Sequence, residues 1–191
     1  MRMTNPNDKA VAILNSARAL MMDRGYNGFS FRDIAAEVGI KSASIHYHYA
    51  TKADLGEATA KAYREAFSDA LDGLDAATAP DLLRAYGALF VATLRDHGGL
   101  CLGGVLAADA TTLPDQVRAE VVAFFDAQHV WVAAVLRQGQ ANAEFRKDFD
   151  AAALARMFVS SLEGAMMVAR AIEHPDDLET TLDLFVHLVR L

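Results

Sequence analysis

Residues 29–52 read FSFRDIAAEVGIKSASIHYHYATK and contain two short helical patterns separated by one glycine. The first pattern begins at Ser30, whose hydroxyl is expected to accept a backbone N–H. Asp33 lies three residues later, which is the spacing of a capping box. Gly39 follows the apolar face of this helix and can end it in the left-handed conformation. Residues 41–44 restart the helix, so the stretch predicts a helix-turn-helix.

The second helix of this pattern has an unusually polar surface. Ile45 and Tyr49 are four residues apart and are expected to share the inward face. The other side chains offer hydroxyl, imidazole, phenol and ammonium groups, which hydrogen-bond to phosphates and base edges. Thr51 and Asp54 form a second capping box. Lys52 lies in the first turn after it, where an unpaired cation opposes the helix dipole and suits an external phosphate. The predicted DNA contacts are Arg32, Lys41, Ser42, Ala43, Ser44, His46, Tyr47, His48, Thr51 and Lys52.

Residues 31–55, FRDIAAEVGIKSASIHYHYATKADL, resemble without a gap the DNA-binding segment of the TetR family of bacterial transcriptional regulators. His46 stands where that family more often has tyrosine, and Ala50 stands where it has proline. The resemblance implies an all-α fold of about nine helices. It implies a three-helix DNA-binding domain over 7–67 and a helical effector-binding and dimerisation domain over 68–191.

The composition also favours an all-helical protein. The chain has 191 residues, of which 53% are hydrophobic, and only four prolines, which are rare inside helices. Its single cysteine excludes an intrachain disulfide and suits a reducing compartment. No run approaches the roughly 20 uninterrupted apolar residues of a membrane span, and the N-terminus lacks the apolar segment of a secretory signal. We therefore expect a cytoplasmic protein with no membrane partner.

The net charge of −7 is unevenly distributed. Residues 1–52 have seven Lys or Arg against four Asp or Glu, a net charge of +3. Residues 53–191 have eleven against twenty-one, a net charge of −10. The positive end coincides with the helix-turn-helix, where a nucleic-acid interface is expected.

Catalytic motifs are missing from the sequence. It has no glycine-rich phosphate loop, HExxH motif, nucleophile elbow or cysteine pair, so no catalytic residue, metal ligand or cofactor is predicted. Two alternatives to DNA binding stay open: a helical protein-interaction module, and a helical enzyme that uses unrecognised residues. A mobility shift with the DNA upstream of the gene would separate them.

Residues 97–104 contain four glycines and the single cysteine, Cys101. His97, four residues earlier, could stabilise a thiolate and make Cys101 a sensor of electrophiles. The alternative is a small buried hydrophobic residue. Residues 100–140 also resemble one branch of the TetR family, and the family resemblance implies a ligand cavity in this domain. The candidate ligand contacts are Phe90, His97, Cys101, Phe125, Trp131 and Met157.

Two helices expected over 151–172 and 176–190 have apolar faces too wide for one core. A second copy of the chain would cover the remainder in a four-helix bundle, and the resemblance implies the same place. The alternative is that both helices only complete the monomer core. The predicted dimer contacts are Phe158, Ser161, Leu162, Ala165, Val168, Leu182, Phe185 and Val189.

The resemblance implies a ligand-responsive transcriptional regulator. Its simplest form is a repressor that a small-molecule or electrophile effector releases from a palindromic operator. The expected partners are double-stranded operator DNA, a second copy of the chain and that effector.

Overall fold

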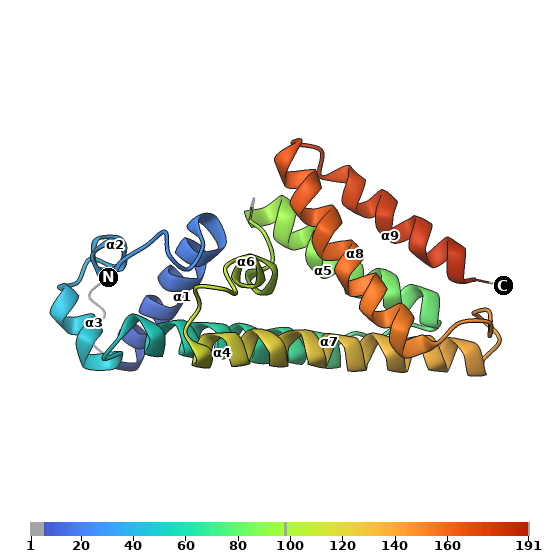
Figure 1. Ribbon diagram of the computed structural model, residues 1–191, viewed down its shortest axis with the longest axis horizontal. Helices are drawn as coiled ribbons and strands as arrows, with labels where there is room; N and C mark the ends of the chain where they lie inside the picture. The colour runs from blue at the N-terminus through green and yellow to red at the C-terminus, as the bar shows by residue number, and fades with distance from the viewer. Residues whose placement is uncertain (1–5, 98, 191) are drawn as a thin grey trace. The chain divides into compact units, whose positions relative to one another are not determined.

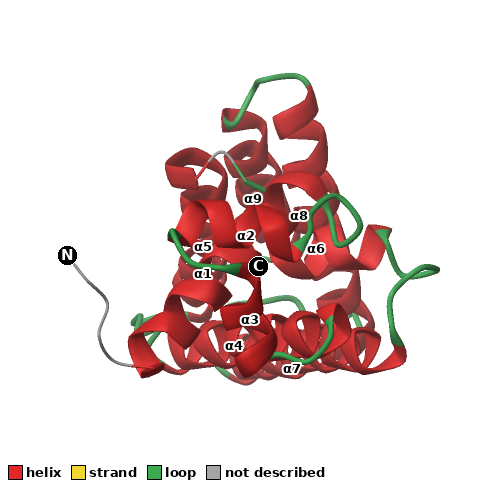
Figure 2. Cartoon of the chain, turned by 90° about the vertical axis from the view of Figure 1, so that its left-hand side faces the viewer, coloured by secondary structure: helices red, strands yellow, loops and turns green. Residues whose placement is uncertain are grey.

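The computed structural model describes residues 6–97 and 99–190, which form helices and loops with no β-strand beyond one isolated bridge, Phe145 to Arg190 (Figures 1 and 2). This confirms the all-α prediction. The helices of the described residues are α1 (Pro6–Arg24), α2 (Phe31–Val38), α3 (Ser42–His48), α4 (Lys52–Asp72), α5 (Ala79–His97), α6 (Leu102–Ala108), α7 (Asp115–Ala141), α8 (Ala151–Ala171) and α9 (Asp176–Val189).

The chain forms two compact units. The first combines Met1–Ala66 with Leu102–Ala123, and the second combines Phe67–Cys101 with Phe124–Leu191. The break after Ala66 lies beside the predicted boundary at 67/68, whereas the inclusion of α6 and the start of α7 in the first unit was not expected. The apolar side chains of α6 explain it, because Leu102 and Leu106 are buried and α6 packs on α1. The functional domain limits 7–67 and 68–191 stay a prediction.

The first unit is built on α1, which packs against α2 and α6. Its buried side contains Ile13, Ala17 and Met21. Val11 lies outside this buried side and is 51% exposed. Ser16, a polar residue, lies on the buried side.

The second unit has its core between α5, α8 and α9, which pack against one another. The rings of Phe158 on α8 and Phe185 on α9 have centroids 4.2 Å apart. Gly87 lets α5 pack closely on α9, because a Cβ at this position would overlap the side chain of Leu182.

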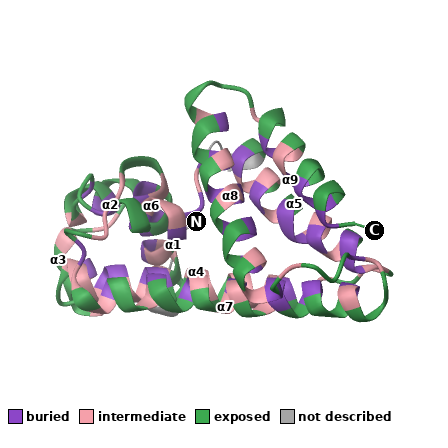
Figure 3. Cartoon of the chain, turned by 45° about the vertical axis from the view of Figure 1, so that its right-hand side comes forward, coloured by how far each residue is buried: buried purple, intermediate pink, exposed green. Residues whose placement is uncertain are grey.

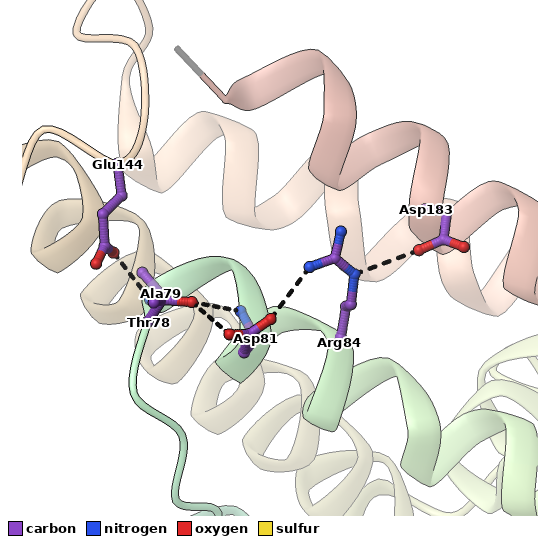
Figure 4. Close-up of polar contacts among 6 residues, drawn as sticks. All are labelled: Thr78, Ala79, Asp81, Arg84, Glu144 and Asp183. Carbon is purple, nitrogen blue, oxygen red and sulfur yellow. Dashed lines mark hydrogen bonds and ion pairs between the residues drawn. The ribbon is translucent and has the colours of Figure 1, made fainter.

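Polar contacts fix the start of α5 within the second unit (Figure 4). Thr78 and Asp81 form a capping pair, in which the Thr78 hydroxyl donates to the carboxylate at 2.7 Å and accepts the Asp81 N–H at 3.3 Å. The first N–H of α5 donates to Glu144 at 2.9 Å. Arg84 then joins α5 to α9 through Asp183, at 3.4 Å. Helix α5 therefore begins at Ala79, directly after Thr78.

Helices α7 and α8 are long and apolar enough to cross a membrane by length and composition alone, with mean hydropathies of 1.4 and 1.3 over their most apolar stretches. The core helices of soluble proteins pass the same test. Such helices are weak evidence for a membrane span, and the expectation of no membrane partner stays a prediction.

Candidate nucleic-acid interface

The start and end of α2 are set by its flanking residues, close to the sequence prediction. The Asp33 carboxylate accepts hydrogen bonds from the Ser30 N–H at 2.7 Å and from the Ser30 hydroxyl at 2.6 Å. Both hydrogen bonds of the predicted capping box are present, and the hydroxyl in addition donates to the Asp33 carboxylate. These bonds hold the pKa of the Asp33 carboxyl below its usual value. Gly39 ends the helix at φ +72°, the left-handed conformation that glycine adopts without strain.

Helix α3 exposes most of the side chains that the sequence analysis assigned to DNA. Ile45 is fully buried and fixes the rotation of the helix. Tyr47 points outward and is 84% exposed. Lys41, Ala43 and His46 are also exposed, and Ser42, Ser44 and His48 are half-buried.

His46 is exposed but held in place by α2 and by the turn after α3. Its Nδ1 lies 3.2 Å from the carbonyl oxygen of Ala50, and its ring meets Phe31 edge-on with centroids 4.8 Å apart. The ring of His46 is therefore held in one position, and a contact made by a fixed ring loses less conformational entropy than one made by a mobile ring.

The turn into α4 is a complete capping box, as predicted. The Thr51 N–H donates to Asp54 at 2.9 Å, and the Asp54 N–H donates to the Thr51 hydroxyl at 3.1 Å.

Lys52 differs from the prediction, because its ammonium is engaged inside the unit. It donates to the carbonyl oxygen of Phe29 at 2.5 Å and lies over the rings of Phe29 and Tyr26, at 4.2 and 5.0 Å from their centroids. Burial lowers the pKa of this amine, and the nearby Asp33 raises it by less. The expectation of an unpaired charge was therefore wrong. Lys52 ties the start of α4 to the residues that precede α2.

An open hollow beside α2 and α3 brings several predicted residues together. It is lined by Phe29, Ser30, Phe31, Arg32, Ser42, His46 and Lys52. Phe29, Ser30 and Phe31 were not among the predicted contacts. Their position next to Arg32, at the helix start that the capping box defined, was the available signal.

The segment 102–123 fastens onto this DNA-binding part within the first unit. The carboxylate of Asp109, just after α6, accepts the Tyr26 N–H at 2.8 Å. Arg64 on α4 forms an ion pair with Glu120 on α7 at 2.8 Å. The turn after α1 and the middle of α4 are therefore bound to the segment that follows Cys101 in the chain.

The residues predicted to contact a ligand do not form one group. Phe90 and Cys101 are buried, and Phe125 and Trp131 are half-buried. Met157 is 53% exposed and lies on the outward face of α8, so its assignment to a cavity is corrected. His97 is the last residue of α5, and its side chain lies outside the described residues.

A polar cluster that the sequence analysis missed lies in the core of the second unit. The Tyr86 hydroxyl donates to the side-chain oxygen of Gln128 at 2.5 Å, and the Cys101 thiol donates to the Glu163 carboxyl. Burial raises the pKa of Glu163 to about 7, while the thiol lowers it by less. Glutamine and glutamate at buried positions of helices were the signal, hidden because most such residues lie on polar faces.

Glu163 makes the stability of the fold depend on pH. Burial raises the pKa of the Glu163 carboxyl to about 7 in the folded protein. The stability of the fold is therefore highest below the ordinary pKa of about 4.5, and stability is lost as pH rises through about 7. The shift corresponds to a loss on the order of 3 kcal/mol. We expect Glu163→Gln to remove this loss, so that denaturant unfolding from pH 4.5 to 8 shows the variant gaining on the wild type. Parallel curves for the two proteins would contradict the assignment.

The predicted dimer contacts divide into two sets. Phe158, Leu162, Leu182, Phe185 and Val189 are at most 7% exposed. They belong to the core of the second unit, and their assignment to an interface is corrected. The inner faces of α8 and α9 pack against α5, so the side chains on these faces are not available to a second copy of the chain. Val168 is 58% exposed, while Ser161 and Ala165 are half-buried.

Comparisons with known proteins agree with this architecture. Residues 13–59 match the family described as bacterial regulatory proteins, tetR family, and residues 79–185 match the tetracyclin repressor-like C-terminal domain. The chain is 30% identical over 165 residues to the transcriptional regulator AcuR of Cereibacter sphaeroides, covering 84% of this chain and 75% of that protein. It is 26% identical over 179 residues to the HTH-type transcriptional repressor DhaR of Mycobacterium sp. strain GP1, covering 89% and 86%. It superposes on a TetR-family regulator from Agrobacterium tumefaciens with a TM-score of 0.92 and 33% identity, covering 98% and 100%.

The helix-turn-helix and the helical second unit define a DNA-binding transcriptional regulator, and not an enzyme. The chain belongs to the TetR family of bacterial regulatory proteins.

Proposed function

We propose that this protein is a cytoplasmic, dimeric repressor that leaves a palindromic operator when a small molecule binds its second unit. The observation that carries the proposal is the outer surface of α3 and its N-cap, where Lys41, His46 and Tyr47 are exposed. The buried Ile45 fixes which face of the helix points outward. The similarity to DhaR, which is named a repressor, supports the direction of regulation.

In this proposal α3 enters the major groove of the operator. One short helix reads few bases, so a two-fold dimer reads two half-sites about one helical turn apart. Ser42, Ser44, His46 and Tyr47 supply contacts to base edges and sugars. Arg32, Lys41 and Thr51, all exposed, supply contacts to phosphates.

The test uses Tyr47 and the DNA upstream of the gene. We expect Tyr47→Ala to lower operator affinity about tenfold, since each subunit loses a contact, and to leave stability unchanged because the side chain is 84% exposed. A mobility shift and thermal unfolding measure the two effects.

Tyr47→Phe is the matched control, because it keeps the ring and removes only the hydroxyl. If the hydroxyl binds phosphate, this variant loses affinity as Tyr47→Ala does; if the ring packs against sugar or base, it binds normally. Wild-type affinity in a folded Tyr47→Ala protein contradicts the placement of α3 on DNA.

Helices α8 and α9 have exposed positions (Figure 3), and the apolar residues among them support the dimer. The members of this apolar face are between 50% and 58% exposed: Met157, Val168, Ile172, Leu184 and Leu188. Gly164 lies among them on α8, and a Cβ there would meet no atom within 4 Å. A second copy of the chain can therefore approach α8 closely along this face. The contacts proposed for the dimer are these residues with Ser161 and Ala165.

The proposed effector binds without forming a covalent bond to Cys101. This cysteine is 1% exposed, and its thiol donates to the carboxyl of Glu163. Burial shields the thiol from an attacking electrophile, because reactive cysteines are at least partly exposed. We expect a mild electrophile to affect the DNA complexes of wild type and Cys101→Ser alike.

Release follows from a difference in effector affinity between two conformations. Cys101 precedes α6 directly in the chain. Asp109, just after α6, accepts the N–H of Tyr26 in the turn between α1 and α2. This covalent and hydrogen-bonded path supports coupling between the second unit and the DNA-binding helices.

A further inference from the structure

Two buried polar atoms of the second unit have no hydrogen-bond partner among the described residues. They are Nε2 of Gln128 on α7 and Oε1 of Glu163 on α8. Gln128 is fully buried, and Glu163 is 9% exposed. Buried polar groups of this kind are normally satisfied, so an amide donor and a carboxyl acceptor indicate a missing partner.

Both residues belong to the cluster around Tyr86. The Tyr86 hydroxyl occupies the amide oxygen of Gln128, which leaves both N–H groups of the amide to another acceptor. Burial raises the pKa of Tyr86 well above its ordinary value, and Glu163 and then Cys101 raise it further. The Glu163 carboxyl therefore raises the pKa of the same Tyr86 hydroxyl that holds the Gln128 amide by a hydrogen bond.

The surroundings of this cluster are aromatic and apolar. The Tyr86 ring stacks on Trp131 at 5.6 Å, and it contacts Phe90 at 5.3 Å and Phe158 at 5.7 Å. Among the described residues, no Lys or Arg contributes to the pKa shift of Tyr86 or Glu163. An anionic ligand here would lie buried beside an acid without a cation, which is costly.

We propose that Gln128 and Glu163 form the polar end of the effector site and select a small neutral molecule with an adjacent hydrogen-bond acceptor and donor. A carboxamide or an alcohol has this chemistry. Its oxygen accepts from Nε2 of Gln128, and its N–H or O–H donates to Oε1 of Glu163. The inference rests on the proposed function, of which it specifies the ligand class.

The proposal predicts the sign of the pH dependence of binding. A donor on the ligand favours the ionised Glu163 carboxyl, so affinity falls as pH drops through about 7. A carboxylate ligand favours the protonated carboxyl and gives the opposite sign. The titratable groups facing Glu163 are Tyr86 from α5 and Cys101 before α6, while α7 contributes the neutral Gln128 and the buried residues of α9 are apolar.

The experiment measures calorimetric binding of butanamide, 1-butanol and butanoate to the full-length protein at pH about 6 and about 8. We expect the amide and the alcohol to bind, about tenfold more weakly at the lower pH, where most of Glu163 is protonated. Butanoate is expected to bind least. Glu163→Gln keeps an acceptor oxygen, so it should bind butanamide equally at both pH values.

Gln128→Met keeps the side-chain volume and removes the N–H donors, so it should lose at least about tenfold in affinity at both pH values. Gln138→Met, an exposed residue of the same helix, is the matched control and should bind as wild type. Thermal unfolding and a mobility shift confirm that each variant is folded and binds DNA.

Tighter binding of butanoate, or binding that strengthens as pH falls, overturns the proposed ligand class. Absence of binding by all three probes, in protein that still shifts its upstream DNA, also overturns it and leaves the proposed function intact. Wild-type protein that does not bind that DNA contradicts the proposed function itself.

Discussion

Replacement of Leu184 by glutamate is expected to convert the protein to a folded monomer and to lower operator affinity at least about 100-fold. Leu184 is 56% exposed on α9, in the apolar face shared with Val168 and Leu188. A charge there would be buried without a partner when two copies associate, at a cost of several kcal/mol. A monomer keeps only one half-site of the operator, so most of the affinity is lost. Sedimentation and a mobility shift measure both effects.

Two controls separate the interface from the fold. Val122→Glu makes the same change at a residue that is 55% exposed on α7, and it should leave the dimer intact. Phe185→Glu changes the residue next to Leu184, but Phe185 is 7% exposed and packs on Phe158 at 4.2 Å. It should unfold the second unit. A Leu184→Glu protein that remains a dimer with full affinity would place the interface elsewhere.

Lys52→Ala is expected to cost about 3 kcal/mol of stability and to lower operator affinity more than tenfold. The change removes a charged hydrogen bond to the Phe29 carbonyl and the cation–π contacts with Phe29 and Tyr26. Without them α4 is no longer tied to the residues before α2, and the orientation of α3 is less well defined. Denaturant unfolding and a mobility shift provide the readouts.

Salt dependence separates this positioning role from a phosphate contact. Lys52→Ala should bind more weakly with the same slope of affinity against salt, because its ammonium is used inside the protein. Lys41→Ala, at an exposed residue before α3, should keep its stability and reduce the slope by about one ion per subunit. A Lys52→Ala protein with normal stability and a shallower slope would restore the phosphate contact that the sequence suggested.

The local signals in the sequence were sufficient for the helix-turn-helix. The Ser30 and Asp33 spacing, Gly39 and the Thr51 and Asp54 pair located α2, α3 and the start of α4, because caps depend on residues within one turn of each other. The exposure of Tyr47 followed in turn from the burial of Ile45, since both lie on one short helix.

Faces of helices that meet several neighbours could not be predicted in this way. Helical periodicity predicted the broad apolar faces of α8 and α9, but Phe158 and Phe185, which were assigned to the dimer, are buried in the core of the second unit. Periodicity gives the width of an apolar face and does not say which side meets α5 and which side is left exposed. The structure shows Val168 and Leu184 on the exposed side.

The sequence by itself determined the all-α class and the helix-turn-helix, because short-range capping and periodicity are encoded in neighbouring residues. The regulator family was indicated separately, by the resemblance of residues 31–55 to a known family. Only the tertiary structure decided the partners of Lys52, the cluster of Tyr86, Gln128 and Glu163, and the return of α6 to the first unit. Gln128 and Glu163 are 35 positions apart in the chain. The placement of both residues near Tyr86 depends on how α5, α7 and α8 pack, and that packing is a property of the whole core.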